Sequence, residues 1–204
     1  MLGLPQSTQV DRRIPKEKLY LNANMAPQVR DAIKDQIESI IWRNKLAAGT
    51  LGLSTGETVA EIEVFEVQLR QKSMDKRVLA AIAQAIPYKI LFILTFAGEA
   101  QAWMETSGTF YTTDWFAFDT FTIRLEGLNL DSVYENLVRH IAGGRLDSEG
   151  DLADAVSRDK ERQKLEREIA ALEKKILHEK QFNRQVELNS ELKKLQKELE
   201  ALNR

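Results

Sequence analysis

Two series of apolar residues toward the C-terminal end of the sequence constrain the fold most strongly. The first series steps by four, three and four residues and consists of Leu165, Ile169, Leu172 and Ile176. The second continues the same alternation and consists of Leu188, Leu192, Leu195, Leu199 and Leu202. Such spacing aligns apolar side chains along one stripe of an α-helix, which is the seam of a coiled coil. An isolated helix gains little stability while its stripe faces water, so each seam requires a helical partner.

The segment between the two seams decides which partner each one meets. No alternation of three and four residues joins Ile176 to Leu188, so the helical phase changes between them. The chain can turn near residues 180–184 and form a hairpin, or one long helix can continue through a phase slip and meet a second chain. We favour the hairpin because it satisfies both seams within one molecule. The alternative predicts a homo-oligomer formed through the coiled coil.

The composition changes near residue 150 and indicates the domain organisation. Residues 151–204 carry 13 Lys or Arg and 12 Asp or Glu, whereas all three Trp and all four Pro precede them. The stretch GGRLDSEGD at residues 143–151 is rich in residues that break helices and strands. We therefore expect an N-terminal arm at residues 1–20, a globular domain at residues 21–147 and a coiled coil at residues 152–204.

The globular domain is predicted to be α+β, with helices packed on a mixed sheet of about four to five strands. A helix capped by Asn24 is expected to run past Ile33 and Ile37 to Leu46, because these apolar residues recur at helical spacing. Further helices are expected at residues 74–86 and 128–142, and strands at residues 61–70, 88–96, 101–105 and 109–115. The helix between the first two strands predicts a right-handed parallel crossover, and the tight turns after them predict antiparallel pairing.

Several classes of function lack their required residues. The chain has no Cys, which excludes disulfides, thiolate metal sites and a cysteine nucleophile, and its two His cannot form a three-His zinc site. It contains no phosphate loop, no G-x-G-x-x-G and no G-x-S-x-G motif. We therefore expect neither a metal nor a cofactor. The most apolar stretch, residues 90–97, is too short to span a membrane, and no export signal is evident, so a cytoplasmic location is expected.

One group of residues permits a catalytic alternative. Nucleases of the PD-(D/E)xK class hold Mg²⁺ with a carboxylate and an acid-x-lysine motif on the next strand. Here Glu66 and Gln68 would stand at the acid and lysine positions, and Glu57 is a candidate for the second carboxylate. Glutamine replaces the lysine, and Glu61 and Glu63 project from the opposite face of the strand. An ordinary role for Glu66 and Gln68 at a sheet edge is the competing interpretation.

A second alternative is nucleic-acid binding without cleavage. Candidate phosphate contacts are Arg12 and Arg13 in the arm and Lys174, Lys175, Lys180 and Arg184 in the coiled coil. The net charge of −2 gives no overall basic signal, and neighbouring glutamates weaken any focused field. Seven aromatic residues at positions 103–121 could stack bases or anchor a protein, although a hydrophobic core explains them as well.

The sequence also resembles a known family along its whole length. The resemblance rests on the segments LGLPQSTQVDRRIPKEKLY, DQIESIIWRNKLA, EIEVFEVQL, AIPYKILFILTFAGEAQAWM, TDW, LNLDSVYENLVRHIAG and EKQFNRQVELNSELKKLQKEL, which occur here in this order. They are similar to the bacterial domain-of-unknown-function 4391 family, which supplies no catalytic residues to carry over.

The resemblance implies a role rather than a reaction. Members of that family are similar in being small cytoplasmic proteins, often found near helicases and DNA methyltransferases of restriction-like, antiphage defence clusters. We therefore expect a non-enzymatic accessory subunit of a DNA-processing assembly. Its globular domain would dock a larger helicase or methyltransferase partner, and its coiled coil would fix the geometry of the assembly.

Overall fold

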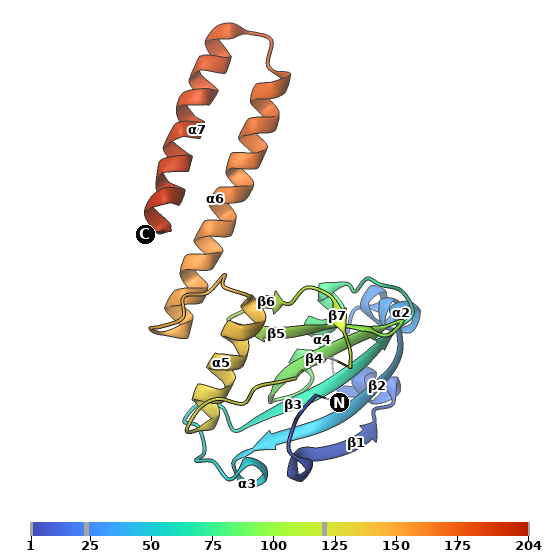
Figure 1. The fold of residues 1–204 in the computed structure, drawn as a ribbon. Coiled ribbons are helices and arrows are strands. Elements are labelled where there is room, and N and C mark those ends of the chain that lie inside the picture. Colours follow the sequence, from blue (N-terminus) through green and yellow to red (C-terminus); the bar gives the residue numbers. More distant parts are fainter. Residues whose placement is uncertain (1, 23–24, 120–121, 204) are drawn as a thin grey trace. The chain divides into compact units, whose positions relative to one another are not determined.

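The computed structural model describes residues 2–22, 25–119 and 122–203. Asn24, expected to cap a helix, and Phe121, the last member of the aromatic cluster, lie outside these residues. The chain divides into two compact units, one ending at Gly144 and the other beginning at Arg145 (Figure 1). No helix among the described residues has the length and apolar character needed to cross a membrane.

The first unit is built on one mixed sheet. Its strands follow the spatial order β1 (Gln9–Arg13), β2 (Ile37–Ala47), β3 (Glu61–Leu69), β4 (Lys89–Phe96), β5 (Glu99–Thr106) and β6 (Thr109–Thr112). A short strand, β7 (Phe116–Ala117), pairs with β5. β3 and β4 are parallel, and the other pairs are antiparallel. The predicted α+β class and mixed sheet are confirmed, with more strands than expected.

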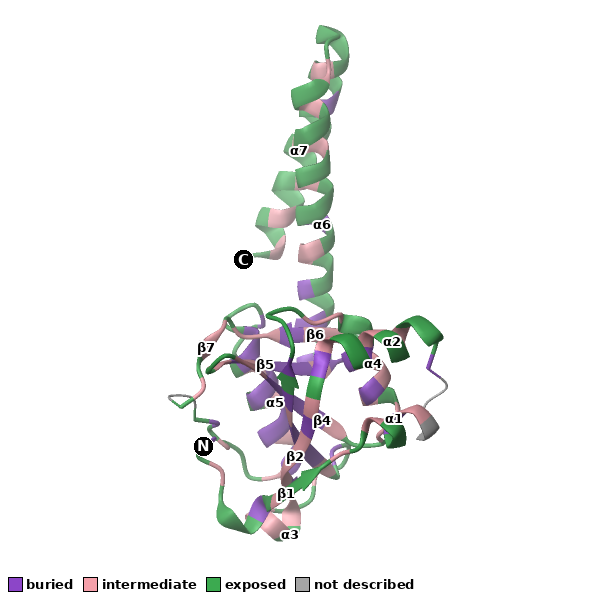
Figure 2. Ribbon diagram, turned by 90° about the vertical axis from the view of Figure 1, so that its right-hand side faces the viewer, coloured by how far each residue is buried: buried purple, intermediate pink, exposed green. Residues whose placement is uncertain are grey.

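Helices cover both faces of this sheet. On one face, α1 (Lys16–Asn22), α2 (Pro27–Gln36) and α4 (Lys76–Gln84) pack on alternate residues of β3 and β4, including Phe65, Val67 and Phe92. On the other, α5 (Leu130–Ala142) packs against β5 and β6, where the Tyr134 hydroxyl donates to the Glu105 carbonyl at 2.9 Å. Figure 2 shows the buried residues concentrated in the central strands and these helices. The continuous apolar run of β4 follows from this double covering.

α4 forms the predicted parallel crossover between β3 and β4. The Asp75 carboxylate caps its first turn by accepting from the Arg77 N–H at 2.9 Å. Two further short helical segments, η1 (Gln6–Thr8) and α3 (Ala48–Leu51), flank β1 and β2. Residues 1–20, expected as an arm, therefore contain η1, β1 and part of α1.

The helix predicted through Leu46 is wrong beyond residue 36. α2 ends at Gln36, and Ile37 begins β2, which is the longest strand of the sheet. The carbonyl of Gln36 accepts from Arg70 N–H at 2.8 Å, so the end of β3 fixes this change of direction. Register shifts between Ile37 and Ser39 and between Trp42 and Asn44 break the alternation of β2. These irregularities conceal the strand period and leave the isoleucines at a helical spacing.

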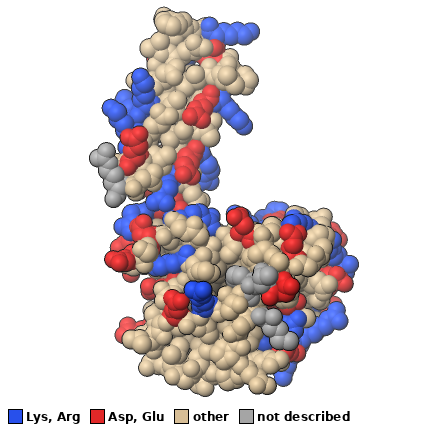
Figure 3. All heavy atoms as spheres, in the orientation of Figure 1, with Lys and Arg blue, Asp and Glu red and all other residues tan. Residues whose placement is uncertain are grey.

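The second unit contains the predicted helical hairpin. α6 (Leu152–His178) and α7 (Phe182–Leu202) pack against each other as antiparallel helices within one chain (Figure 1). Every member of both seams is buried or half-buried, and Leu165 and Leu188 are the most enclosed, with 8% and 1% of their surface exposed. On the face drawn in Figure 3, charged side chains of both signs are scattered along the helices. The intramolecular alternative for the seams is therefore confirmed.

Candidate functional site

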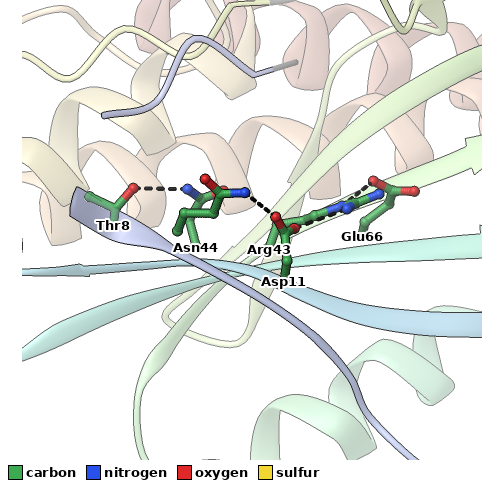
Figure 4. A network of polar contacts seen from close by, with 6 residues as sticks. Thr8, Asp11, Arg43, Asn44 and Glu66 are labelled. Atoms are coloured by element: carbon green, nitrogen blue, oxygen red, sulfur yellow. Dashed lines mark hydrogen bonds and ion pairs between the residues drawn. The ribbon is translucent and has the colours of Figure 1, made fainter. Parts of the chain in front are cut away.

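Glu66 belongs to a network of polar contacts on the sheet face opposite Phe65. Arg43 Nε donates to Glu66 Oε2 at 2.8 Å, and its Nη1 donates to Asp11 Oδ1 at 2.9 Å (Figure 4). Asn44 Nδ2 donates to Thr8 Oγ1 at 2.8 Å and ties η1 to the same part of β2. Hydrogen bonds from Gln9 and Arg43 hold the pKa of Asp11 below its ordinary value. Arg43 is thus neutralised by two carboxylates, which leaves it little capacity to bind an anion.

A crevice lies beside this network at the carboxyl ends of the parallel strands β3 and β4. It has a volume of about 500 Å³, and its lining includes Glu66, Gln68, Arg70, Thr95 and Glu99. The carboxyl ends of parallel strands are where open sheets commonly bind ligands. The structure therefore brings Glu66 and Gln68 together, on one face and in one hollow.

Glu57, the candidate second carboxylate, lies elsewhere. It lies in the loop that precedes β3, and its backbone N–H donates to the carboxylate of Asp131 in α5. Even Glu61, at the start of β3, is separated from Glu66 by about 16 Å of extended strand. Gln68 Oε1 accepts from Ser39 Oγ at 3.0 Å. Among the described residues no group of three His, Asp or Glu side chains is arranged to hold a metal. The ion pair between Glu66 and Arg43, at 2.8 Å, favours a structural role for Glu66.

Sequence reasoning missed the most perturbed carboxyl group of the sheet, that of Glu63. Only 4% of Glu63 is exposed, and its Oε2 has no hydrogen-bond partner among the residues that the structure describes. Burial raises the pKa of Glu63 to about 7, and the neighbouring Glu61 carboxylate acts in the same direction, while Trp42 and Lys45 oppose it. The sequence did carry a signal, because Glu63 stands between Ile62 and Val64 and shares its face of β3 with Phe65 and Val67.

A loop ahead of β3 is held by one carboxylate from α5. Asp131 accepts hydrogen bonds from the N–H groups of Glu57 at 2.6 Å and Val59 at 2.8 Å, and from Thr58 Oγ1 at 2.8 Å. Desolvation works against the charged form, but these hydrogen bonds outweigh it and keep the pKa of Asp131 below its ordinary value. A Cβ on Gly56 would lie 2.5 Å from Asp131 Oδ1, so this position accepts only glycine.

Replacing Asp131 by alanine is expected to lower the free energy of unfolding of the first unit by about 2 kcal/mol, because several backbone donors lose a charged acceptor. Urea titration followed by tryptophan fluorescence measures the change. Asp154→Ala is the matched control, since Asp154 also lies in the first turn of a helix but is exposed. The control is expected to change stability by less than about 0.5 kcal/mol. Equal effects of both substitutions would contradict this role of Asp131.

The candidate nucleic-acid contacts fall in both units. Arg12 and Arg13 are adjacent in β1 and are paired with Trp42 and Ile41 of β2, so they project to opposite faces of the edge strand. In the hairpin, Arg184 Nη1 is paired with Glu187 at 2.5 Å. The remaining cations, Lys174, Lys175 and Lys180, are exposed and form no ion pair with other described residues.

Exposed apolar side chains lie at the end of the hairpin where α6 connects to α7. Leu177 is 79% exposed, Phe182 is 76% exposed and Val186 is 53% exposed. They flank residues 179–181, which connect α6 to α7, and none of them belongs to either seam. We name these three residues the tip patch. Large apolar groups that cluster on a surface commonly mark a site of protein interaction.

The chain combines a mixed α+β domain with an antiparallel helical hairpin that ends in an apolar patch. It belongs to the DUF4391 family, a domain of unknown function whose family model matches residues 2–199. That match covers the sheet, its helices and nearly all of the hairpin. No curated protein and no solved structure matches the chain.

Proposed function

We propose that this protein is a non-enzymatic accessory subunit that binds a larger protein through its helical hairpin. The observation that carries the proposal is the tip patch, because three large apolar residues within ten positions of the chain are left in water. The hairpin buries its own seams, so its stability does not require these residues. A surface of this kind gains free energy when a partner covers it.

The family resemblance of the sequence indicates the kind of assembly in which this interaction takes place. It implies a cytoplasmic protein of a bacterial DNA-processing assembly, in a restriction-like or antiphage defence system. A helicase or a DNA methyltransferase is the partner that this setting favours. The first unit is then the folded domain that precedes the hairpin in the chain.

Removal of residues 157–204 tests the proposal. The truncated protein keeps the buried residues Leu152, Ala155 and Val156 at the start of α6. We expect it to retain the circular dichroism of the sheet but to lose the partner that co-purifies with the full chain from its native host. Quantitative mass spectrometry of both preparations measures this loss. Retention of the same partner by the folded, truncated protein would contradict the proposal.

A further inference from the structure

The three residues of the tip patch lie on one side of the hairpin. Leu177 directly follows the seam residue Ile176, and Val186 directly follows Gln185, which is half-buried three positions before the seam residue Leu188. Antiparallel helices are related by a two-fold axis perpendicular to the pair, so equal offsets from the two seams fall on the same side. Phe182 lies one helical turn before Val186 and shares its stripe.

Lysines border this side of the hairpin, together with the exposed Glu173 four positions before Leu177 on α6. Lys174 is one turn before Leu177 on α6, Lys180 lies in the connecting loop, and Lys193 is two turns after Val186 on α7. All three are exposed and form no ion pair with other residues that the structure describes. Glu179, the acidic residue of the loop, accepts from the backbone N–H groups of Lys180 and Gln181. These hydrogen bonds lower its pKa and orient its carboxylate back toward the chain.

From this arrangement we infer that the tip patch binds an amphipathic helix of the partner whose apolar stripe is flanked by acidic residues. The apolar groups span about one to two helical turns, which matches the anchors of a helix that lies across them. The lysines provide charge complementarity for flanking carboxylates. A second copy of this chain fits less well, because it would bring the same lysines against one another. This inference rests on the proposed function and names the chemistry of the partner.

A synthetic peptide supplies the probe. It is a fluorescein-labelled helical peptide of about 14 residues, with leucines at helical spacing and glutamates elsewhere. Titration with the full chain, followed by fluorescence anisotropy, is expected to show saturable binding. The triple variant Leu177→Gln, Phe182→Gln, Val186→Gln is expected to weaken binding at least about tenfold. The double variant Lys174→Glu, Lys193→Glu is expected to weaken it as well, with a smaller dependence on salt.

Leu128→Gln is the matched control, because Leu128 is 88% exposed but belongs to the first unit. It is expected to bind the peptide as the unsubstituted chain does. Equal binding of a peptide with lysines in place of the glutamates would overturn the inference. So would a dimer in sedimentation that the triple variant dissociates, or binding to phosphatidylserine vesicles without binding to the acidic peptide.

Co-purification separates a failure of this inference from a failure of the proposed function. If the partner is lost on removal of residues 157–204 but retained by the triple variant, the hairpin binds the partner elsewhere and the inference fails alone. If the partner is retained in both cases, the proposed function fails. Loss in both cases, together with binding of the acidic peptide, supports both.

Discussion

Replacement of Leu188 by aspartate is expected to unfold the α6–α7 hairpin while the sheet of the first unit stays folded. Leu188 is 1% exposed and is the most enclosed member of the two seams. Truncating a buried leucine costs about 2–5 kcal/mol, and a carboxylate in its place adds an uncompensated charge. We therefore expect the hairpin to lose about 4 kcal/mol or more of stability, which exceeds the total stability expected of a two-helix unit.

Circular dichroism at the helical minimum measures this effect, because α6 and α7 contribute 27 and 21 residues to the helical content. The aromatic signal of the sheet is expected to remain, since all three Trp lie in the first unit. Leu177→Asp is the control on the same hairpin, where 79% exposure predicts a change below about 0.5 kcal/mol. Comparable helical loss in both variants, or in neither, would show that the seam does not hold the hairpin together.

The second large effect is expected at Glu63, where replacement by glutamine should stabilise the first unit at pH 8. The pKa of this carboxyl is about 7 in the folded chain against an ordinary value of 4.5. Between these values the folded state retains a proton that the unfolded state has released. Stability contributed by Glu63 is therefore present below pH 4.5 and is lost as the pH rises to 7. The loss amounts to about 3 kcal/mol.

Glutamine keeps the shape of the protonated acid and has no charge to bury. We expect urea unfolding to show a gain of about 3 kcal/mol for Glu63→Gln at pH 8 and nearly equal stabilities of the two proteins at pH 4. The neighbouring substitution Glu61→Gln serves as control with the opposite sign, because Glu61 pairs with Lys45 at 2.8 Å. If the free energies of unfolding of the Glu63→Gln and unsubstituted proteins changed in parallel with pH, a buried Glu63 carboxyl group with a raised pKa would be contradicted.

The parts of the fold that could be predicted are those where one period dominates the sequence. The seams of α6 and α7 repeat over several turns, and β4 is apolar without interruption, so neither had a competing interpretation. β2 did have one. Its isoleucines at positions 37, 40 and 41 fit a helical spacing, and the register shifts after Ile37 and next to Arg43 remove the alternation that marks a strand. Pairing with β1 and β3 decides its conformation, and this information is not local to the segment.

The polar network around Glu66 likewise depends on contacts that the local sequence does not specify. Strand alternation places Glu66 and Gln68 on one face, as predicted, and their common crevice follows. Arg43 could not be assigned to Glu66 from the sequence, because the contact depends on the register of β2 against β3. Glu57 was grouped with Glu66 by proximity in the chain, whereas the extended geometry of β3 separates them. The burial of Glu63, by contrast, could be predicted from its apolar neighbours on both sides.

The hydrogen bond between Ile123 N–H and the Leu2 carbonyl, at 2.9 Å, joins segments from the two ends of the first unit. β1 likewise pairs with residues about thirty positions later in the chain. The sheet therefore has many contacts between residues distant in sequence, which slows folding. α6 and α7 are connected by a loop of only a few residues, and local helical pairs form within about microseconds to milliseconds. During refolding from the unfolded state, we therefore expect the hairpin that carries the tip patch to be complete while the sheet is still assembling.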